Sequence, residues 1–322
     1  MITIAGAGVA GLACALELAK RGRSVTIYET GNGPSDNKCS WFAGGMLAPY
    51  CEGESAEDVV VQLGMGAVDW WDDITPVNRS GSLAVAQPRD RADLSRFARR
   101  TTKHQLINAD QLAELEPALT GRFTNGLFFK DEAHLNPRRA LIDLTDRVLA
   151  LGVDIRYGTP APDHVDVDCR GLAADQPDMR PVRGEMAILY APDVTITRTV
   201  RLLHPRIPLY LVPRAGGQYM VGATMIESDR TGAITVRSLL ELLGAAFALH
   251  PGLGEAEVIE TGVGLRPAYR DNIPRVTRHG DTFHVNGLYR HGFLLAPALA
   301  AQLAAHFIQE NADEHHSERC SA

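Results

Sequence analysis

The sequence predicts an α/β fold with two parts: a Rossmann-like domain on a parallel sheet, and a second domain built on a mostly antiparallel sheet with helices. The first observation is a β-type run at residues 2–5, a glycine turn, an Ala- and Leu-rich helix at residues 9–20 and a buried strand at residues 24–28. Such a strand–helix–strand opening implies a parallel sheet. The second observation is an alternating apolar and polar pattern at residues 186–200 and 210–221, which is typical of an antiparallel sheet.

The later elements follow in chain order and decide how the domains are divided. Apolar periodicity predicts helices at residues 55–73, 138–151, 235–248 and 294–308, and strands at residues 81–86, 126–129, 153–157 and 283–286. Parallel α/β pieces therefore alternate with antiparallel pieces along the chain. We assign residues 1–75, 131–185 and 259–310 to the first domain, residues 76–130 and 186–258 to the second, and residues 311–322 to a flexible polar tail.

Composition and charge exclude several classes of function. The 322 residues carry a formal net charge of −7, whereas a general nucleic-acid binder should be basic, so no nucleic-acid partner is expected. The five cysteines lack metal-ligand spacing and form a poor disulfide framework, which predicts no metal site and a reducing, cytoplasmic location. The apolar N-terminal stretch lacks a basic segment and is interrupted by glycines, which argues against a signal peptide. No stretch reaches membrane-spanning length, so no membrane association is expected.

Residues 6–11, Gly-Ala-Gly-Val-Ala-Gly, match the dinucleotide-binding pattern G-x-G-x-x-G. The pattern follows a strand, opens a helix and is followed by an acid, Glu29, at the end of the second strand, which is the context that supports it. Gly6 would make the tight turn, Gly8 would let the backbone approach a pyrophosphate, and Gly11 would let helix and strand pack closely. Glu29 would accept hydrogen bonds from a ribose hydroxyl. The motif alone does not choose between NAD and FAD.

Residues 40–49, Ser-Trp-Phe-Ala-Gly-Gly-Met-Leu-Ala-Pro, resemble the flavin-contacting loop of the glycine oxidase (ThiO) branch of the D-amino-acid oxidase family. Five further segments resemble the same branch, namely residues 182–185, 210–213, 221–225, 264–267 and 287–297. The matches extend from residue 2 to about residue 308, which is almost the whole chain. The resemblance implies that the first domain is a Rossmann-like FAD-binding domain of the GR2, D-amino-acid oxidase type and that the second binds substrate.

The resemblance implies a noncovalently bound FAD. Covalently flavinylated relatives carry a cysteine near the C-terminal flavin loop, and residues 287–297 contain none. The residues expected to contact FAD are Gly6, Gly8, Val9, Ala10, Gly11, Glu29, Ser40, Ala43, Gly44, Gly45, Met46, Val165, Arg266, Tyr289, Arg290, His291, Gly292, Phe293 and Leu294. The positive end of the last helix should point at the flavin C2 carbonyl. One departure from the family is the short stretch at residues 157–168, where Val165 or a neighbour would contact the adenine half.

The resemblance also implies where a small amino acid would bind. Arg266 is the expected clamp, because a planar guanidinium binds both oxygens of a carboxylate. Tyr210 can donate a hydrogen bond to the same carboxylate, and Arg290 is expected to bind substrate or close the site. Met46 and Met225 are expected to pack near the pocket and limit its size. An ordinary surface arginine, core tyrosine or core methionine is the alternative at each of these positions.

The expected reaction is oxidation of glycine to its imine, then to glyoxylate and ammonia, with hydride transfer to FAD and reduction of O2 to H2O2. By resemblance the imine would serve thiazole assembly in thiamine biosynthesis. Hydride transfer from a neutral amine needs no strong base at carbon, so His291 is expected to position rather than to accept a proton. Sarcosine or D-alanine as substrate, another electron acceptor, a nicotinamide dehydrogenase and a noncatalytic flavin-binding protein remain open. A homo-oligomer is expected.

Overall fold

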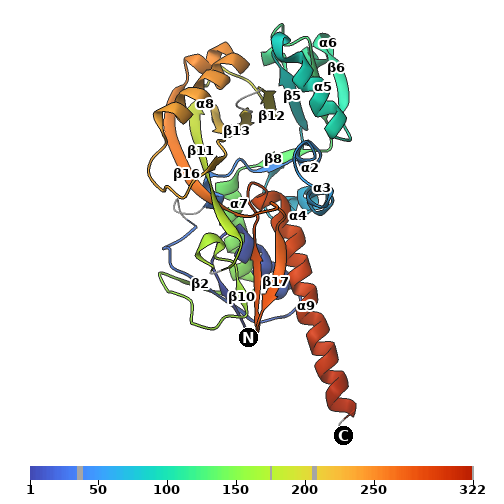
Figure 1. The fold of residues 1–322 in the computed structure, drawn as a ribbon, viewed down its shortest axis with the longest axis vertical. Coiled ribbons are helices and arrows are strands. Elements are labelled where there is room, and N and C mark those ends of the chain that lie inside the picture. Colours follow the sequence, from blue (N-terminus) through green and yellow to red (C-terminus); the bar gives the residue numbers. More distant parts are fainter. Residues whose placement is uncertain (35–38, 175, 205–208, 321–322) are drawn as a thin grey trace.

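A computed structural model describes residues 1–34, 39–174, 176–204 and 209–320, with side chains as far as residue 308. A six-stranded sheet lies toward the end that carries both termini, and a nine-stranded sheet lies at the opposite end (Figure 1). A small three-stranded sheet lies between them. The predicted α/β fold class is confirmed.

The six-stranded sheet has the order β17-β18-β10-β1-β2-β9. Its strands are β1 (Ile2–Ala5), β2 (Val25–Glu29), β9 (Asp154–Tyr157), β10 (Val167–Asp168), β17 (Arg275–His279) and β18 (Thr282–Asn286). All neighbours are parallel except β17 and β18, which form an antiparallel hairpin at one edge. The parallel core follows from the strand–helix–strand opening, since parallel strands need crossover connections.

Three helices accompany this sheet, and they are α1 (Val9–Lys20), α7 (Pro137–Ala150) and α9 (Gly292–Cys320). Helix α1 is apolar almost all round, and its residues from Val9 to Leu18 are buried. Such a helix is stable only when it is covered on several sides. The sheet, α7 and α9 provide that cover, and their side chains join those of α1 in one apolar core.

The nine-stranded sheet has the order β15-β11-β14-β13-β12-β5-β7-β6, and β16 pairs with the other edge of β11. Its strands are β5 (Ser82–Ala86), β6 (Gln105–Asn108), β7 (Asn125–Phe129), β11 (Met179–Tyr190), β12 (Thr199–Leu203), β13 (Leu209–Pro213), β14 (Gln218–Gly222), β15 (Ile226–Glu227) and β16 (Glu257–Tyr269). Pairing is antiparallel apart from β5 with β12. The boundaries expected at residues 185 and 258 fall inside β11 and β16, so both strands run on past the predicted division.

The remaining helices surround the nine-stranded sheet or join the two ends of the molecule. They are α2 (Pro49–Glu52), α3 (Asp58–Gly64), α4 (Ala67–Asp72), α5 (Arg91–Arg100), α6 (Ala109–Leu115) and α8 (Val236–Leu249). The small sheet consists of β3 (Met46–Leu47), β4 (Val77–Asn78) and β8 (Ala133–Leu135). Short 3₁₀ turns lie at Cys39–Phe42, Pro88–Asp90, Pro117–Leu119, Gly171–Ala173 and Pro251–Gly254.

The single helix predicted at residues 55–73 is wrong, because the chain forms the two short helices α3 and α4. Gly64 and Gly66 lie at the break, where glycine favours interruption of a helix. A Cβ atom on Gly64 would lie 2.9 Å from the Leu294 side chain. The glycine therefore allows α3 to approach α9 closely.

Helix α9 begins two residues before the predicted start and extends to Cys320, through most of the segment expected as a flexible tail. The side chains of that segment lie outside the described part. The proline at position 297 removes the N–H that would bond the Phe293 carbonyl. The indole Nε1 of Trp71 donates to that carbonyl instead, at 2.7 Å.

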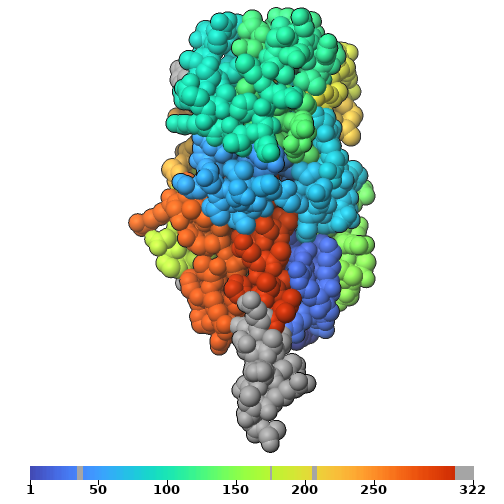
Figure 2. All heavy atoms as spheres, turned by 90° about the vertical axis from the view of Figure 1, so that its right-hand side faces the viewer, coloured from blue at the N-terminus to red at the C-terminus, as the bar shows by residue number. Residues whose placement is uncertain are grey.

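In Figure 2, α9 (red) lies between the N-terminal segment (blue) and the β17–β18 hairpin (orange). Within the four described ranges of the chain, no helix combines the length and low charge needed to cross a membrane.

Candidate active site

A cavity of about 920 Å³ runs between the six-stranded and nine-stranded sheets. At one end it is lined by the glycine turn after β1 and by the end of β2. It continues along residues 39–46 and ends among β11, β13, β16 and the start of α9. Segments from the two predicted domains therefore form a single site.

The glycine turn closes the first end of the cavity. Gly6 has φ of +95°, a conformation that residues with a side chain rarely adopt. A Cβ atom on Gly11 would lie 1.9 Å from the Gly6 carbonyl oxygen, so only glycine lets α1 pack this closely on the turn. A Cβ atom on Gly8 would meet only the Ser40 hydroxyl, at 3.9 Å, and Gly8 lines the cavity where α1 begins. A helix start with free N–H groups is a favourable place for phosphate.

Glu29 lies beside this turn at the end of β2 and lines the cavity. One carboxylate oxygen accepts from the Ala7 N–H and the other from the Gly31 N–H, each at 2.8 Å. These two bonds hold the carboxylate in place at the cavity wall. The geometry suits an acid that accepts from ribose hydroxyls.

The wall opposite Glu29 differs from the sequence expectation. Val165 is buried and does not line the cavity, and its carbonyl accepts from the Thr282 hydroxyl. The wall is built instead by Pro160, Ala161 and residues 169–173. The turn at Gly171–Ala173 comes shortly after β10, which ends at Asp168.

The loop at residues 40–46 forms the middle of the cavity. A Cβ atom on Gly44 would lie 3.0 Å from the Tyr210 ring, and one on Gly45 would lie 2.3 Å from the Leu135 carbonyl oxygen. The two glycines thus bring the loop backbone against β13 and β8. Sequence reasoning missed the residue that fixes this loop, which is Arg214.

Arg214 donates to the Gly44 carbonyl at 2.7 Å and to the Leu135 carbonyl at 3.0 Å. Burial, and then the nearby charge of Arg138, lowers the pKa of Arg214 to about 9, which leaves the group cationic at neutral pH. Its position next to residues 210–213 was the only signal in the sequence.

The start of α9 closes the middle of the cavity on the other side. Tyr289, Arg290, His291, Gly292, Phe293 and Leu294 all line the cavity. The first N–H groups of a helix have no partners within the helix, and its N-terminus carries partial positive charge. The wall therefore favours electron density on a group bound beside it.

Residues 1–306 match the DAO family, which is described as FAD dependent oxidoreductase. The chain belongs to this family of FAD-dependent oxidoreductases. It is 51% identical to the "Putative thiamine biosynthesis oxidoreductase ThiO" of Rhizobium etli, over 96% of this chain and 97% of that protein. It is 24% identical to the glycine oxidase of Bacillus subtilis, over 94% and 91%. The glycine oxidase structure from Geobacillus kaustophilus superposes with a TM-score of 0.80 at 22% identity, covering 96% and 94%.

The enzyme is therefore a flavoprotein, and the cavity fits FAD. The cradle without side chains at Gly6 and Gly8 suits the pyrophosphate, the fixed carboxylate of Glu29 suits the ribose, and the start of α9 suits the flavin. Among the residues predicted to hold FAD, Gly11 and Val165 do not line the cavity, and the others do. Gly11 acts through packing beneath the turn.

Arg266 lies on β16 and lines the cavity. Its guanidinium lies over Gly184 of β11, where a Cβ atom would be 2.3 Å from the guanidinium carbon. Nη1 donates to the Thr224 carbonyl at 2.8 Å. No acidic side chain of the described ranges forms an ion pair with Arg266, and the guanidinium lines the cavity. Arg266 is thus held in place and has charge available for an anionic ligand.

Tyr210 is near enough to this guanidinium to feel its charge, and Met46 lines the same cavity. Met46, Phe42 and Tyr210 pack against an apolar group formed by Met186, Ile188, Val212 and Met220. Burial raises the pKa of the Tyr210 phenol, although the charge of Arg266 opposes this. The phenol therefore stays protonated at neutral pH and can donate a hydrogen bond.

Arg290 also lines the cavity, but its charge is already paired. Its Nη2 lies 2.9 Å from Oε2 of Glu52, and the same carboxylate lies 2.9 Å from Nε2 of His291 and 2.8 Å from Nη2 of Arg201. Sequence reasoning missed Glu52 and Arg201, because a single acid in a four-residue helix and an arginine in a strand carry no distinctive pattern. Burial lowers the pKa of His291, and its contact with Glu52 agrees with a positioning role.

Met225 lies outside the cavity, with 47% of its surface exposed. Its sulfur accepts from the Tyr289 hydroxyl at 3.4 Å and contacts Nη1 of Arg290 at 3.7 Å. The structure therefore places Met225 behind two cavity residues rather than in the wall itself.

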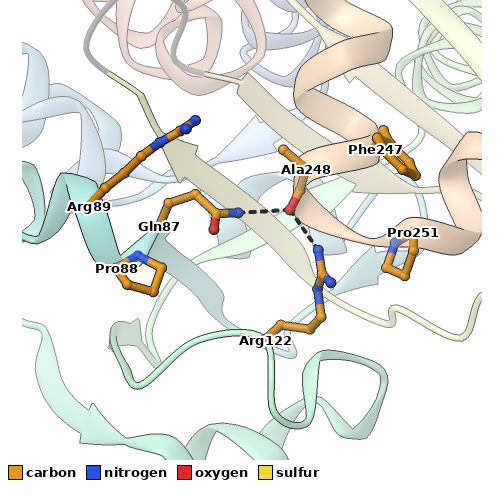
Figure 3. A pocket seen from close by; sticks show the side chains of 7 residues that line it. All are labelled: Gln87, Pro88, Arg89, Arg122, Phe247, Ala248 and Pro251. Carbon is orange, nitrogen blue, oxygen red and sulfur yellow. Dashed lines mark hydrogen bonds between the residues drawn. The ribbon is translucent and has the colours of Figure 1, made fainter.

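A second hollow, of about 530 Å³, lies at the surface next to α8. Figure 3 shows that Gln87 and Arg122 both point toward the Ala248 carbonyl, and they donate to it at 2.8 and 3.0 Å. Its other lining residues are Pro88, Arg89, Phe247 and Pro251. This hollow contains no acid and no nucleophile, so the cavity between the sheets is the candidate active site.

Proposed function

We propose that this enzyme oxidises a small amino acid, glycine foremost, to its imine. The observation that carries the proposal is Arg266, a guanidinium at the cavity wall with no carboxylate partner among the described residues. Water converts the imine of glycine to glyoxylate and ammonia. The similarity to proteins named ThiO supports a role of the imine in thiamine biosynthesis.

Different side chains bind different parts of the substrate. Arg266 binds the carboxylate through its planar fork, and Tyr210 donates a hydrogen bond to the same group. The apolar side chains of Met46 and Met186 exclude water and leave space for a substrate with a small side chain. The substrate Cα–H is thereby directed along the cavity toward the start of α9.

No side chain needs to remove a proton from carbon. The chemistry that FAD supplies when bound is acceptance of a hydride from Cα of the neutral amine, and O2 then takes up the two electrons to give H2O2. His291 is held by Glu52 and stays neutral, because burial lowers its pKa. The residues therefore bind and orient the amine and do not act as a base.

Anaerobic addition of glycine to the purified yellow protein tests the proposal. We expect the visible absorbance of the oxidised flavin to bleach, and air to restore it with formation of one H2O2 per glycine. Sarcosine and D-alanine serve as competing substrates in the same assay. A protein that retains FAD but is bleached by none of the three amines would contradict the proposal. Bleaching without peroxide in air would assign a different electron acceptor.

A further inference from the structure

A buried cluster of charges borders the substrate end of the cavity. Glu52 is only 6% exposed and lies at its centre. One oxygen of the carboxylate lies 2.8 Å from Nη2 of Arg201, and the other lies 2.9 Å from both Arg290 and His291. Glu52 is buried, whereas Arg201 and Arg290 are both partly buried, and Arg290 lines the cavity.

The charges of this cluster are fixed at neutral pH. Burial by itself would raise the pKa of Glu52, but Arg290 and Arg201 lower it well below the ordinary value, so the carboxylate is ionised. His291 is neutral, because burial lowers its pKa. Glu52 therefore forms ion pairs with two guanidinium groups at once. One of its oxygens contacts both Arg290 and His291.

Arg266 and Arg290 line the same cavity and differ in one respect. Arg266 has no acidic partner among the described residues, whereas Arg290 is paired with Glu52. The Tyr210 phenol lines the same cavity and is near enough to Arg266 and Arg290 for both charges to act on its pKa. The third arginine of the lining, Arg170, pairs with Asp168 at 2.6 Å. Among the described residues, Arg266 is therefore the one cavity arginine without an acidic partner.

We propose that Glu52 is a specificity-determining residue that restricts this enzyme to amines with a single carboxylate, because it occupies the guanidinium of Arg290 that would otherwise bind a second one. The inference rests on the proposed function in assigning the first carboxylate to Arg266. A second carboxylate on the substrate would meet Glu52 as a like charge at the position where it needs a cation. Replacement of Glu52 by a neutral isostere removes the repulsion and frees Arg290.

The experiment compares two N-substituted glycines in the wild-type enzyme and in Glu52→Gln. Sarcosine has an N-methyl group, and iminodiacetate has an N-carboxymethyl group. The ratio of their kcat/KM values therefore measures the effect of the second carboxylate on turnover. We expect Glu52→Gln to raise the iminodiacetate-to-sarcosine ratio by about tenfold or more, the size of one charge-assisted hydrogen bond. The double variant Glu52→Gln/Arg290→Met should lose this gain.

Glu116→Gln is the matched control. Glu116 is a fully buried carboxylate that pairs with Arg198 at 3.1 Å, and it does not line the cavity. We expect the substrate ratio of this variant to stay at the wild-type value. An unchanged ratio in Glu52→Gln, or an equal rise in the control, would overturn the proposal.

A binding measurement separates this proposal from the proposed function. Methoxyacetate and diglycolate are the ether analogues of sarcosine and iminodiacetate, and neither can be oxidised as an amine. Titration of the flavin absorbance in the FAD-loaded wild-type enzyme should show weaker binding of diglycolate than of methoxyacetate, with the order reversed in Glu52→Gln. Tighter binding of diglycolate to the wild type refutes the role of Glu52, whether or not any amine is turned over and whether or not the variant folds.

Discussion

Replacement of Arg266 by alanine should impair glycine oxidation and leave FAD in place. The guanidinium forms no ion pair with a described acid and donates to the Thr224 carbonyl at 2.8 Å. Its remaining donors are available to a carboxylate. The fold gives up only the bond to Thr224, which is worth about 1 kcal/mol. The variant should therefore fold.

The expected loss follows from the strength of a hydrogen bond between charged groups. Such a bond contributes about 1.5–3 kcal/mol. Since about 1.4 kcal/mol corresponds to a factor of ten, kcat/KM for glycine should fall roughly 10- to 150-fold, mainly through KM. Arg266→Lys should recover part of the loss, because an ammonium keeps the charge but cannot present two parallel donors.

The assay is peroxide formation at varied glycine concentration, with FAD content measured on the same samples. Arg180→Ala is the control, because Arg180 lies on the neighbouring strand β11 and pairs with the exposed Glu227. Exposed pairs contribute little, so its kinetics should match the wild type. A glycine KM within twofold of the wild type in Arg266→Ala, with FAD bound, would refute the carboxylate clamp.

Three further predictions concern the cofactor site and the stability of the fold. Gly11→Ala places a Cβ atom 1.9 Å from a carbonyl oxygen of the glycine turn and should abolish FAD retention, so a fully yellow variant would contradict the packing argument. Trp71→Phe leaves the Phe293 carbonyl without its donor and should cost about 1–3 kcal/mol, seen as a lower midpoint in thermal unfolding. Burial raises the pKa of Glu132 to about 7, so this group stabilises the fold below pH 4.5 and the contribution is lost as the pH rises to 7. In Glu132→Gln, the free energy of unfolding should fall less between pH 4.5 and 7 than in the wild type, by up to about 3 kcal/mol. A pH profile identical to that of the wild type would refute this assignment.

Local patterns in the sequence were sufficient for the first end of the cavity. The turn between β1 and α1, the third glycine beneath it and the acid at the end of β2 lie within 30 residues of one another, and local spacing fixes their geometry. The start of the last helix was also predicted to within two residues, as was the whole of α1. The break between α3 and α4 was not predicted, because the apolar periodicity continues across Gly64 and Gly66. The close approach of Gly64 to Leu294 is visible only in the structure.

The sequence by itself determined the α/β class and the glycine turn, and it singled out Arg266 as the candidate for binding a carboxylate. Only the tertiary structure decided which arginine is available, since Glu52 meets Arg201 across 149 residues and His291 across 239 residues of chain. Charges are neutralised by neighbours in space, and the sequence does not record those neighbours. The pairing of charges around Arg266 and Arg290 therefore depends on tertiary packing, whereas the geometry of the glycine turn depends on a short segment of sequence.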